Sequence, residues 1–216
     1  MINMTDEKTL KTGTTTVGIV CKDGIVLAAD KRATSGYLIA FKKFQKIVSI
    51  TDSIAVTTAG TVSDVQLLIK YIKAELNLKR IRTGRENTVK EAANLLAMLV
   101  YNNIRKFSVI PGISHFLIAG KDDSGHYLYD LAPDGSIVEI DDFVSSGSGS
   151  VMSYGVLEVL YKKNITVEDG VKLGVQCINA SIRRDIASGN GVDVATITKD
   201  GVKYVLSKEI DALVEI

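Results

Sequence analysis

Cysteine and histidine are scarce in this sequence, and each scarcity argues against a class of function. The 216 residues include two cysteines, Cys21 and Cys177, which are too few for a disulfide framework and fit a reduced, cytoplasmic setting. The two histidines, His115 and His126, have no partners at metal-ligand spacing, so we expect no metal site and no cofactor. No G-x-S-x-G element provides a serine nucleophile.

Long apolar runs and an excess of one charge are also missing. No stretch approaches the length of a membrane span, and the first 13 residues lack the apolar segment of a secretory signal. The chain has 26 basic and 25 acidic residues, so bulk charge gives no basis for binding nucleic acid or a membrane. With 46% hydrophobic and 24% charged residues, the composition is that of an ordinary soluble domain.

Hydrophobic periodicity predicts strands and helices in alternating groups. Helical spacing of apolar residues predicts four helices, with apolar positions at 62–76, 92–100, 152–160 and 167–182. Thr61, Thr88 and Thr166 each precede an acidic residue by three positions, as at capped helix starts. Helices grouped between hairpins indicate a single α+β domain of antiparallel sheets with helices outside them. Strands are expected at 16–21, 25–29, 47–50, 54–59, 115–120, 127–131, 137–140, 192–198 and 202–206.

The N-terminal segment offers an alternative to a histidine base. A free α-amine, with a pKa of about 7.7–8.0, accepts a proton at neutral pH more readily than a lysine near 10.4. Cleavage after Gly13 would give Thr14 both a hydroxyl and a free amine, and glycine permits the backbone geometry that such cleavage requires. The abrupt change from polar residues 1–13 to a core strand fits a removable propeptide. A ragged polar terminus before a threonine-rich strand explains the same residues.

Six short motifs in order resemble those of the catalytic β subunits of the 20S proteasome, which are threonine proteases of the N-terminal-nucleophile (Ntn) family. The resemblance extends from Thr14 to about Leu206 and implies a four-layer αββα sandwich, two antiparallel sheets between helix pairs. The motifs are G-T-T-T-V-G at 13–18, A-A-D-K-R-A-T at 28–34, lysine at 46, A-G at 59–60, G-S-G with Y-G at 147–149 and 154–155, and R-D-I-A-S-G at 184–189.

The resemblance implies a role for each matching residue. Thr14 would be the nucleophile, released by self-cleavage of the Gly13–Thr14 bond, so that 1–13 is a propeptide and 14–216 the catalytic domain. Lys46 would lower the pKa of the Thr14 hydroxyl and amine, and Asp30 would hold Lys46 in place. The Gly60 N–H would stabilise the oxyanion. The residues that would orient the Thr14 amine are Ser148, Asp185 and Ser188.

The resemblance also implies a substrate pocket and an assembly. The pocket residues are small or apolar and none is charged, which predicts chymotrypsin-like cleavage. Heptameric β rings would stack between α-subunit rings (α7β7β7α7), bind a regulatory ATPase through the α rings and degrade unfolded proteins. The substrate-binding positions are Ala33, Thr34, Phe44, Val48, Thr58, Val62 and Gln66.

Other interpretations stay open. A bacterial two-ring protease of the same fold would share the Thr14 chemistry, although the motifs at 147–155 and 184–189 fit the proteasome better. A non-catalytic ring subunit would have no reason to keep Thr14, Asp30 and Lys46 together, yet a surface ion pair also explains the last two. The serine- and glycine-rich run 145–150 could bind a nucleotide phosphate, although it lacks the G-K-[ST] of a P-loop.

Overall fold

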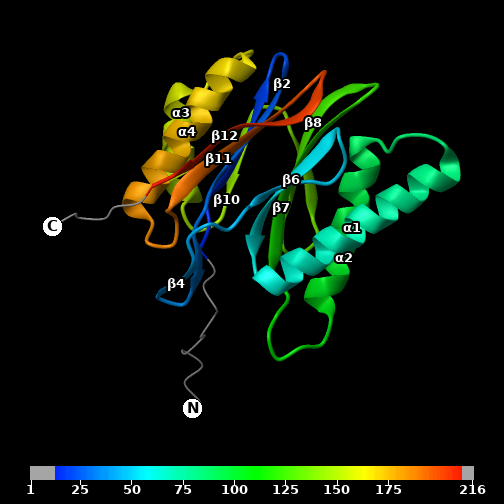
Figure 1. Ribbon diagram of the computed structural model, residues 1–216, viewed down its shortest axis with the longest axis horizontal. Coiled ribbons are helices and arrows are strands. Elements are labelled where there is room, and N and C mark those ends of the chain that lie inside the picture. The colour runs from blue at the N-terminus through cyan, green and yellow to red at the C-terminus, as the bar shows by residue number, and fades with distance from the viewer. Residues whose placement is uncertain (1–12, 211–216) are drawn as a thin grey trace.

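Two five-stranded antiparallel sheets face each other in the computed structural model, which describes residues 13–210 (Figure 1). The first sheet has the order β10-β1-β2-β11-β12 and the second the order β5-β6-β7-β8-β9. The strands of the first sheet are β1 (Thr16–Cys21), β2 (Gly24–Asp30), β10 (Phe143–Ser146), β11 (Gly191–Thr198) and β12 (Gly201–Glu209). Those of the second are β5 (Ile47–Ser49), β6 (Ile54–Gly60), β7 (Ser114–Asp122), β8 (Gly125–Leu131) and β9 (Ile137–Ile140).

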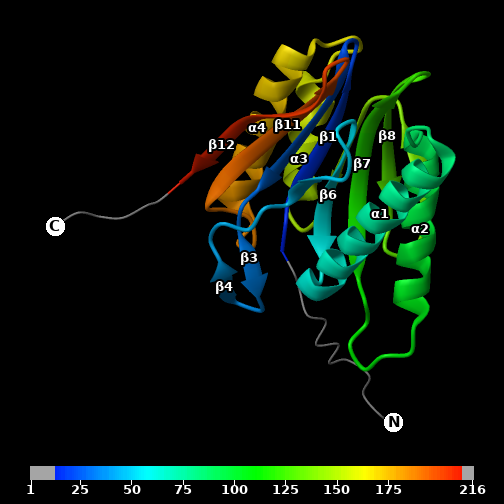
Figure 2. The same ribbon diagram turned by 45° about the vertical axis from the view of Figure 1, so that its right-hand side comes forward.

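A helix pair covers the outer side of each sheet. The helices α1 (Val62–Thr83) and α2 (Val89–Arg105) lie on the second sheet, and α3 (Ser150–Leu160) and α4 (Val167–Arg184) lie on the first (Figure 2). This arrangement confirms the expected α+β class and its αββα layers. A separate hairpin of β3 (Ala33–Ser35) and β4 (Leu38–Phe41) projects beyond the sheets (Figure 2).

Three layers of buried side chains hold the sandwich together. In β2, Val26 and Ala28 pack toward α4, whereas Ile25, Leu27 and Ala29 pack toward the second sheet. Successive side chains of a strand point to opposite faces, so a strand between a helix layer and another sheet must be apolar on both. The continuous apolar run 25–29 therefore belongs to a central strand, as its composition predicts.

The helix starts fulfil the capping expectation only in part. At α2 the Thr88 side chain accepts a hydrogen bond from the Glu91 N–H at 3.2 Å, and Glu91 accepts one from the Thr88 N–H at 3.0 Å, a complete capping box. At α1 the expected Thr61 cap is wrong, because its side chain makes no capping bond. The acidic partner there, Asp64, instead accepts a hydrogen bond from the Asn103 amide at 3.0 Å.

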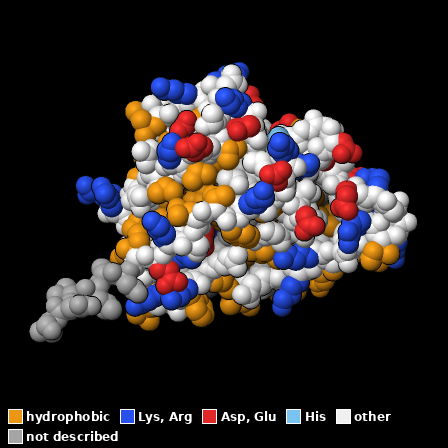
Figure 3. Space-filling view, turned by 45° about the horizontal axis from the view of Figure 1, so that its top comes forward, with side chains coloured by type: hydrophobic (Ala, Val, Ile, Leu, Met, Phe, Trp, Pro, Cys, Tyr) orange, Lys and Arg blue, Asp and Glu red, His pale blue; other side chains and the backbone are white. Residues whose placement is uncertain are grey.

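The surface has no single-sign character on the face seen in Figure 3, where acidic and basic side chains are interspersed among hydrophobic ones. This agrees with the net charge of +1. Within the described range, every helix is too short or too polar to pass through a lipid bilayer.

Candidate active site

A buried ion pair forms the base of the site. Asp30 ends β2 and is 0% exposed, Lys46 precedes β5 and is 1% exposed, and the ammonium lies 2.6 Å from the Asp30 carboxylate. The same carboxylate accepts hydrogen bonds from the N–H groups of Thr15 (2.9 Å), Arg32 (3.0 Å) and Gly189 (2.9 Å). A buried carboxylate with four donors is held in one orientation. The surface-pair explanation of Asp30 and Lys46 is therefore wrong.

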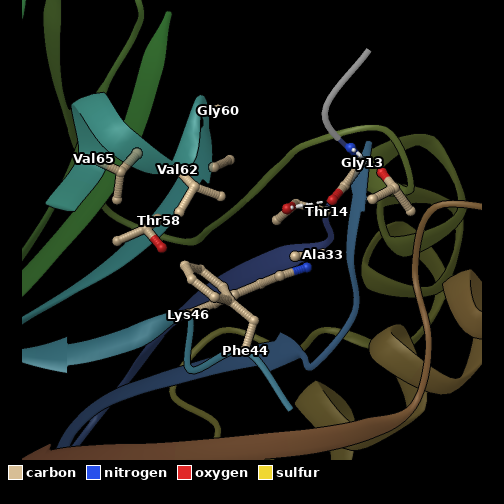
Figure 4. Close-up of a pocket in the computed structure, with 11 residues that line it drawn as sticks. Gly13, Thr14, Ala33, Phe44, Lys46, Thr58, Gly60, Val62 and Val65 are labelled. Carbon is tan, nitrogen blue, oxygen red and sulfur yellow. Dashed lines mark hydrogen bonds between the residues drawn. The ribbon is translucent and has the colours of Figure 1, made fainter. Parts of the chain in front are cut away.

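Burial changes the proton affinity of the lysine. Removal from water lowers the pKa of Lys46 below its ordinary value of 10.5, and the Asp30 carboxylate opposes that effect without reversing it. Lys46 lies on the wall of a cavity that Thr14 also lines (Figure 4). It therefore brings to this cavity a cation that releases its proton more readily than an exposed lysine.

Thr14 lies with its hydroxyl beside the peptide bond that precedes it. The residue is 5% exposed, and its Oγ1 donates a hydrogen bond to the Gly13 carbonyl oxygen at 2.6 Å (Figure 4). Its N–H donates to the Ser148 hydroxyl at 3.2 Å, and its carbonyl accepts from the Gly149 N–H at 3.3 Å. Hydrogen bonds on three sides thus fix this residue against its own upstream carbonyl.

Two glycines make this arrangement possible. A Cβ on Gly13 would lie 1.6 Å from the Ala187 Cβ, so no side chain fits there. A Cβ on Gly147, whose φ is +91°, would lie 2.1 Å from the Thr14 carbonyl oxygen. Both glycines therefore permit the close approach of neighbouring loops to Thr14.

A chain of hydroxyl groups lies behind the Thr14 nitrogen. The Asp185 carboxylate accepts hydrogen bonds from the hydroxyls of Ser148 and Ser188, each at 2.6 Å. Ser188 is also 2.7 Å from the Thr15 hydroxyl, and Asp185 itself is the C-cap residue of α4. Because the Ser148 proton is directed at Asp185, the Ser148 oxygen is left as an acceptor for the Thr14 nitrogen.

The cavity beside Thr14 contains most of the expected substrate-binding positions. Ala33, Thr34, Phe44, Thr58 and Val62 line it. The structure does not bring the other two to the lining: Val48 packs against the α1–α2 core, and Gln66 is exposed on α1. Val65 lines the cavity instead, although the sequence motifs did not suggest it for the pocket. Its position on the apolar face of α1 was the sequence feature that could have indicated it.

Gly60 lies across this cavity from Thr14 (Figure 4). It ends β6 with a φ of +119°, and a Cβ there would lie 2.3 Å from the Ile113 carbonyl oxygen. Glycine is therefore required for the sharp exit of the chain from β6 into α1.

Arg32 supports the site from outside and was not singled out from the sequence, although it belongs to the 28–34 motif. Its Nε donates to the Asn190 side chain and its Nη1 to the Ile186 carbonyl, both at 2.8 Å. It thereby braces the loop that carries Ser188.

The loop 145–150 uses its hydroxyls within the fold. Ser145 donates to the Thr16 carbonyl at 2.8 Å, Ser146 is 2.7 Å from the Thr16 hydroxyl, and Ser148 is bonded to Asp185. The nearby carboxylate would repel a phosphate, so the nucleotide interpretation has no support here.

The histidines do not form a metal site. His115 pairs through Nε2 with Asp130 at 2.5 Å. In the part of the chain that the structure describes, no three His, Cys, Asp or Glu side chains gather closely enough to hold a metal ion.

The αββα sandwich with a threonine just before β1, here Thr14, is the architecture of the N-terminal-nucleophile hydrolases. The sequence matches the Proteasome subunit family over residues 10–197, and the chain belongs to that family. It is 47% identical to "Proteasome subunit beta" of Ferroglobus placidus, over 98% of this chain and 99% of the relative. It is 45% identical to the protein of that name in Archaeoglobus profundus (99% and 97%) and 44% identical to that in Archaeoglobus fulgidus (98% and 97%).

Proposed function

We propose that Thr14 is the nucleophile by which this chain, a threonine-type peptidase and catalytic β subunit of the 20S proteasome, hydrolyses peptide bonds. The observation that carries the assignment to Thr14 is its hydroxyl, 2.6 Å from the Gly13 carbonyl oxygen and close to the buried Lys46–Asp30 pair.

The first reaction of Thr14 is its own release. Its Oγ bonds to the Gly13 carbonyl carbon, the Gly13–Thr14 carbon–nitrogen bond breaks, and the hydroxyl proton passes to the leaving nitrogen. Water then hydrolyses the resulting ester and frees residues 1–13, leaving 14–216 as the catalytic domain. Residues 1–12 lie outside the described residues. The contacts of Gly13 and Thr14 support this step, because they hold the hydroxyl and the carbonyl together.

Peptide hydrolysis then uses the same groups. The Thr14 Oγ attacks the scissile carbonyl, the new α-amine accepts its proton and passes it to the leaving amine, and water releases the acyl group. The Lys46 cation lowers the pKa of that amine and hydroxyl, and Asp30 keeps Lys46 charged and in place. Gly60 donates its N–H to the oxyanion.

The hydroxyl chain behind the nitrogen gives the amine its orientation. Ser148, fixed by Asp185 and with Ser188 on the same carboxylate, accepts a hydrogen bond from the Thr14 amine. This leaves the amine lone pair toward the Thr14 hydroxyl, where a base must act.

The cavity selects an apolar side chain before the cleaved bond. The walls contributed by Ala33, Phe44, Val62 and Val65 are apolar, Thr58 adds a neutral hydroxyl, and the charge of Lys46 is paired with Asp30. Thr34 accepts a hydrogen bond from the Gly13 N–H at 3.2 Å, so it would hold a substrate backbone in the same way. Val48 and Gln66 lie outside this lining. Fluorogenic peptides ending in Tyr or Leu should be cut faster than those ending in Arg.

Assembly with other proteasome subunits follows from the family, and we propose an α7β7β7α7 particle in the cytoplasm. A regulatory ATPase on the α rings would supply unfolded proteins. Large apolar side chains exposed on α1, on the β3–β4 hairpin and in the loop 106–113 support extensive contacts with neighbouring subunits. Examples are Tyr37, Leu38, Tyr71, Ile81, Phe107 and Val109.

The test compares wild type with Thr14→Ala and Thr14→Ser after co-assembly with an α subunit. We expect peptidase activity in wild type, reduced activity in Thr14→Ser, and none in Thr14→Ala despite equal assembly. Full activity in assembled Thr14→Ala would refute the assignment.

A further inference from the structure

A second buried ion pair lies directly behind the first. Lys31 follows Asp30 in the chain, and its ammonium is 2.8 Å from the Asp193 carboxylate on β11 and 2.8 Å from the Ser207 hydroxyl on β12. The side chains of Lys31 and Asp193 are only 11% and 7% exposed. None of these three residues lines the cavity beside Thr14.

Stability alone gives no reason for this pair. Lysine is rarely buried, and replacing a buried ion pair by well-packed apolar side chains is often neutral or stabilising. The lysine stem passes close to Gly191, whose φ is +147°: a Cβ there would lie 2.3 Å from the Lys208 carbonyl oxygen and 2.7 Å from the Lys31 Cδ. Burial of the pair therefore costs desolvation free energy, and its contacts show which parts of the site it holds in place.

The backbone of Lys31 joins two parts of the active site. Its N–H donates to the Gly189 carbonyl at 3.1 Å, and its carbonyl accepts from the Phe44 N–H at 2.9 Å. The first bond fixes the loop that carries Ser188, and the second fixes the segment that leads into Lys46 and lines the cavity.

Alternation along the chain separates the two charges. Asp30 points its carboxylate toward Lys46, whereas the next side chain reaches β11 and β12. A displacement of Lys31 would therefore be transmitted to Asp30 on one side and to Gly189 and Phe44 through the two backbone bonds.

We propose that Lys31 and Asp193 form a positioning pair for the peptidase site, which anchors the end of β2 from behind so that Asp30, Gly189 and Phe44 keep their spacing. The pair touches no reacting atom. The inference rests on the proposed function, because peptidase turnover is its readout.

The experiment uses processed, assembled particles carrying Lys31→Met, Asp193→Asn or Lys31→Arg. We expect the first two to lower kcat about 10- to 100-fold with KM changed less than about threefold, because misplacement near 1 Å has effects of that size. Lys31→Arg keeps the charge and should stay within about threefold of wild type. Lys203→Met, which removes one partner of the exposed Lys203–Asp200 pair, is the matched control and should leave kcat unchanged.

The pH profile separates positioning from general destabilisation. The pKa of Lys46 is lowered by burial and raised by Asp30, with smaller effects of Asp185 (raising) and Arg32 (lowering). If Asp30 moves away from Lys46, it raises the pKa of Lys46 less. The alkaline limb of the kcat–pH profile should therefore move to lower pH in Lys31→Met. Leu76→Ala removes buried side-chain volume in α1 and should destabilise the protein. It serves as the control for destabilisation, and the alkaline limb of its kcat–pH profile should not move.

An unshifted alkaline limb with a kcat loss no greater than that of Leu76→Ala would overturn the inference. If Lys31→Met does not assemble, Ser207→Ala removes one hydrogen bond and no charge, and should show a smaller shift in the same direction with about a threefold loss of kcat. Loss of activity in wild type as well would instead count against the proposed function.

Discussion

Replacement of Gly13 by alanine tests the geometry of self-cleavage without touching the nucleophile. The new Cβ would lie 1.6 Å from the Ala187 Cβ, 2.8 Å from its Cα and 3.1 Å from its carbonyl oxygen. Ordinary carbon contacts are about 3.5–4.0 Å, so Gly13 and Ala187 must separate by about 2 Å. That displacement moves the carbonyl that the Thr14 hydroxyl now contacts at 2.6 Å.

We expect Gly13→Ala to slow processing at least about 100-fold, since misplacement of reacting groups by 1 Å already has effects of that order. The assay follows the intact mass of the subunit over time after mixing with its α partner. Gly155→Ala is the control, because a Cβ there meets nothing within 4 Å. Processing of Gly13→Ala at the wild-type rate would refute the claim that this contact is the reactive one.

Three further predictions concern pH, thiol reactivity and stability. Asp30→Asn removes the carboxylate that raises the pKa of Lys46, so the alkaline limb of any residual activity should move to lower pH; a limb at higher pH would contradict this. Burial raises the pKa of both Cys21 and Cys177 to about 12, so an alkylating reagent at pH 8 should label neither until the protein unfolds. Thr88→Ala should lower stability by about 1 kcal/mol and Tm by about 2–4 °C in a thermal melt, with peptidase activity at 25 °C unchanged.

The larger part of the fold was predictable because its signals are local. The apolar run 25–29 and the helical spacing of Val65, Ile72 and Leu76 can be read from the sequence because these side chains are buried between the layers. Three strands were not expected: β3 and β4 form a largely exposed hairpin, and β10 is a short run of mixed polarity. Neither case has the alternation on which a strand prediction depends.

The sequence motifs named candidate residues for the site, but they gave no information on its geometry. The sequence motifs suggested Asp30 and Lys46 as site residues, but only the structure shows that both are buried. The motifs suggested Gln66 for the pocket, whereas Val65 lines the cavity in the structure. Neighbouring residues of a helix point about 100° apart, so only one of the two can face the cavity. The Lys31–Asp193 pair had no sequence signal, since its partners are far apart in the chain and meet only through strand pairing.

The role of Thr14 as a self-releasing nucleophile is tested by the intact mass of the subunit after co-assembly with its α partner, measured beside Thr14→Ala. We expect wild type to lose residues 1–13 and begin at Thr14, whereas Thr14→Ala keeps its full mass in an equally assembled particle. An assembled wild-type subunit that retains its full mass and still cleaves peptides would contradict the assignment of Thr14 as the nucleophile. The same retention without peptidase activity would instead identify a non-catalytic ring subunit.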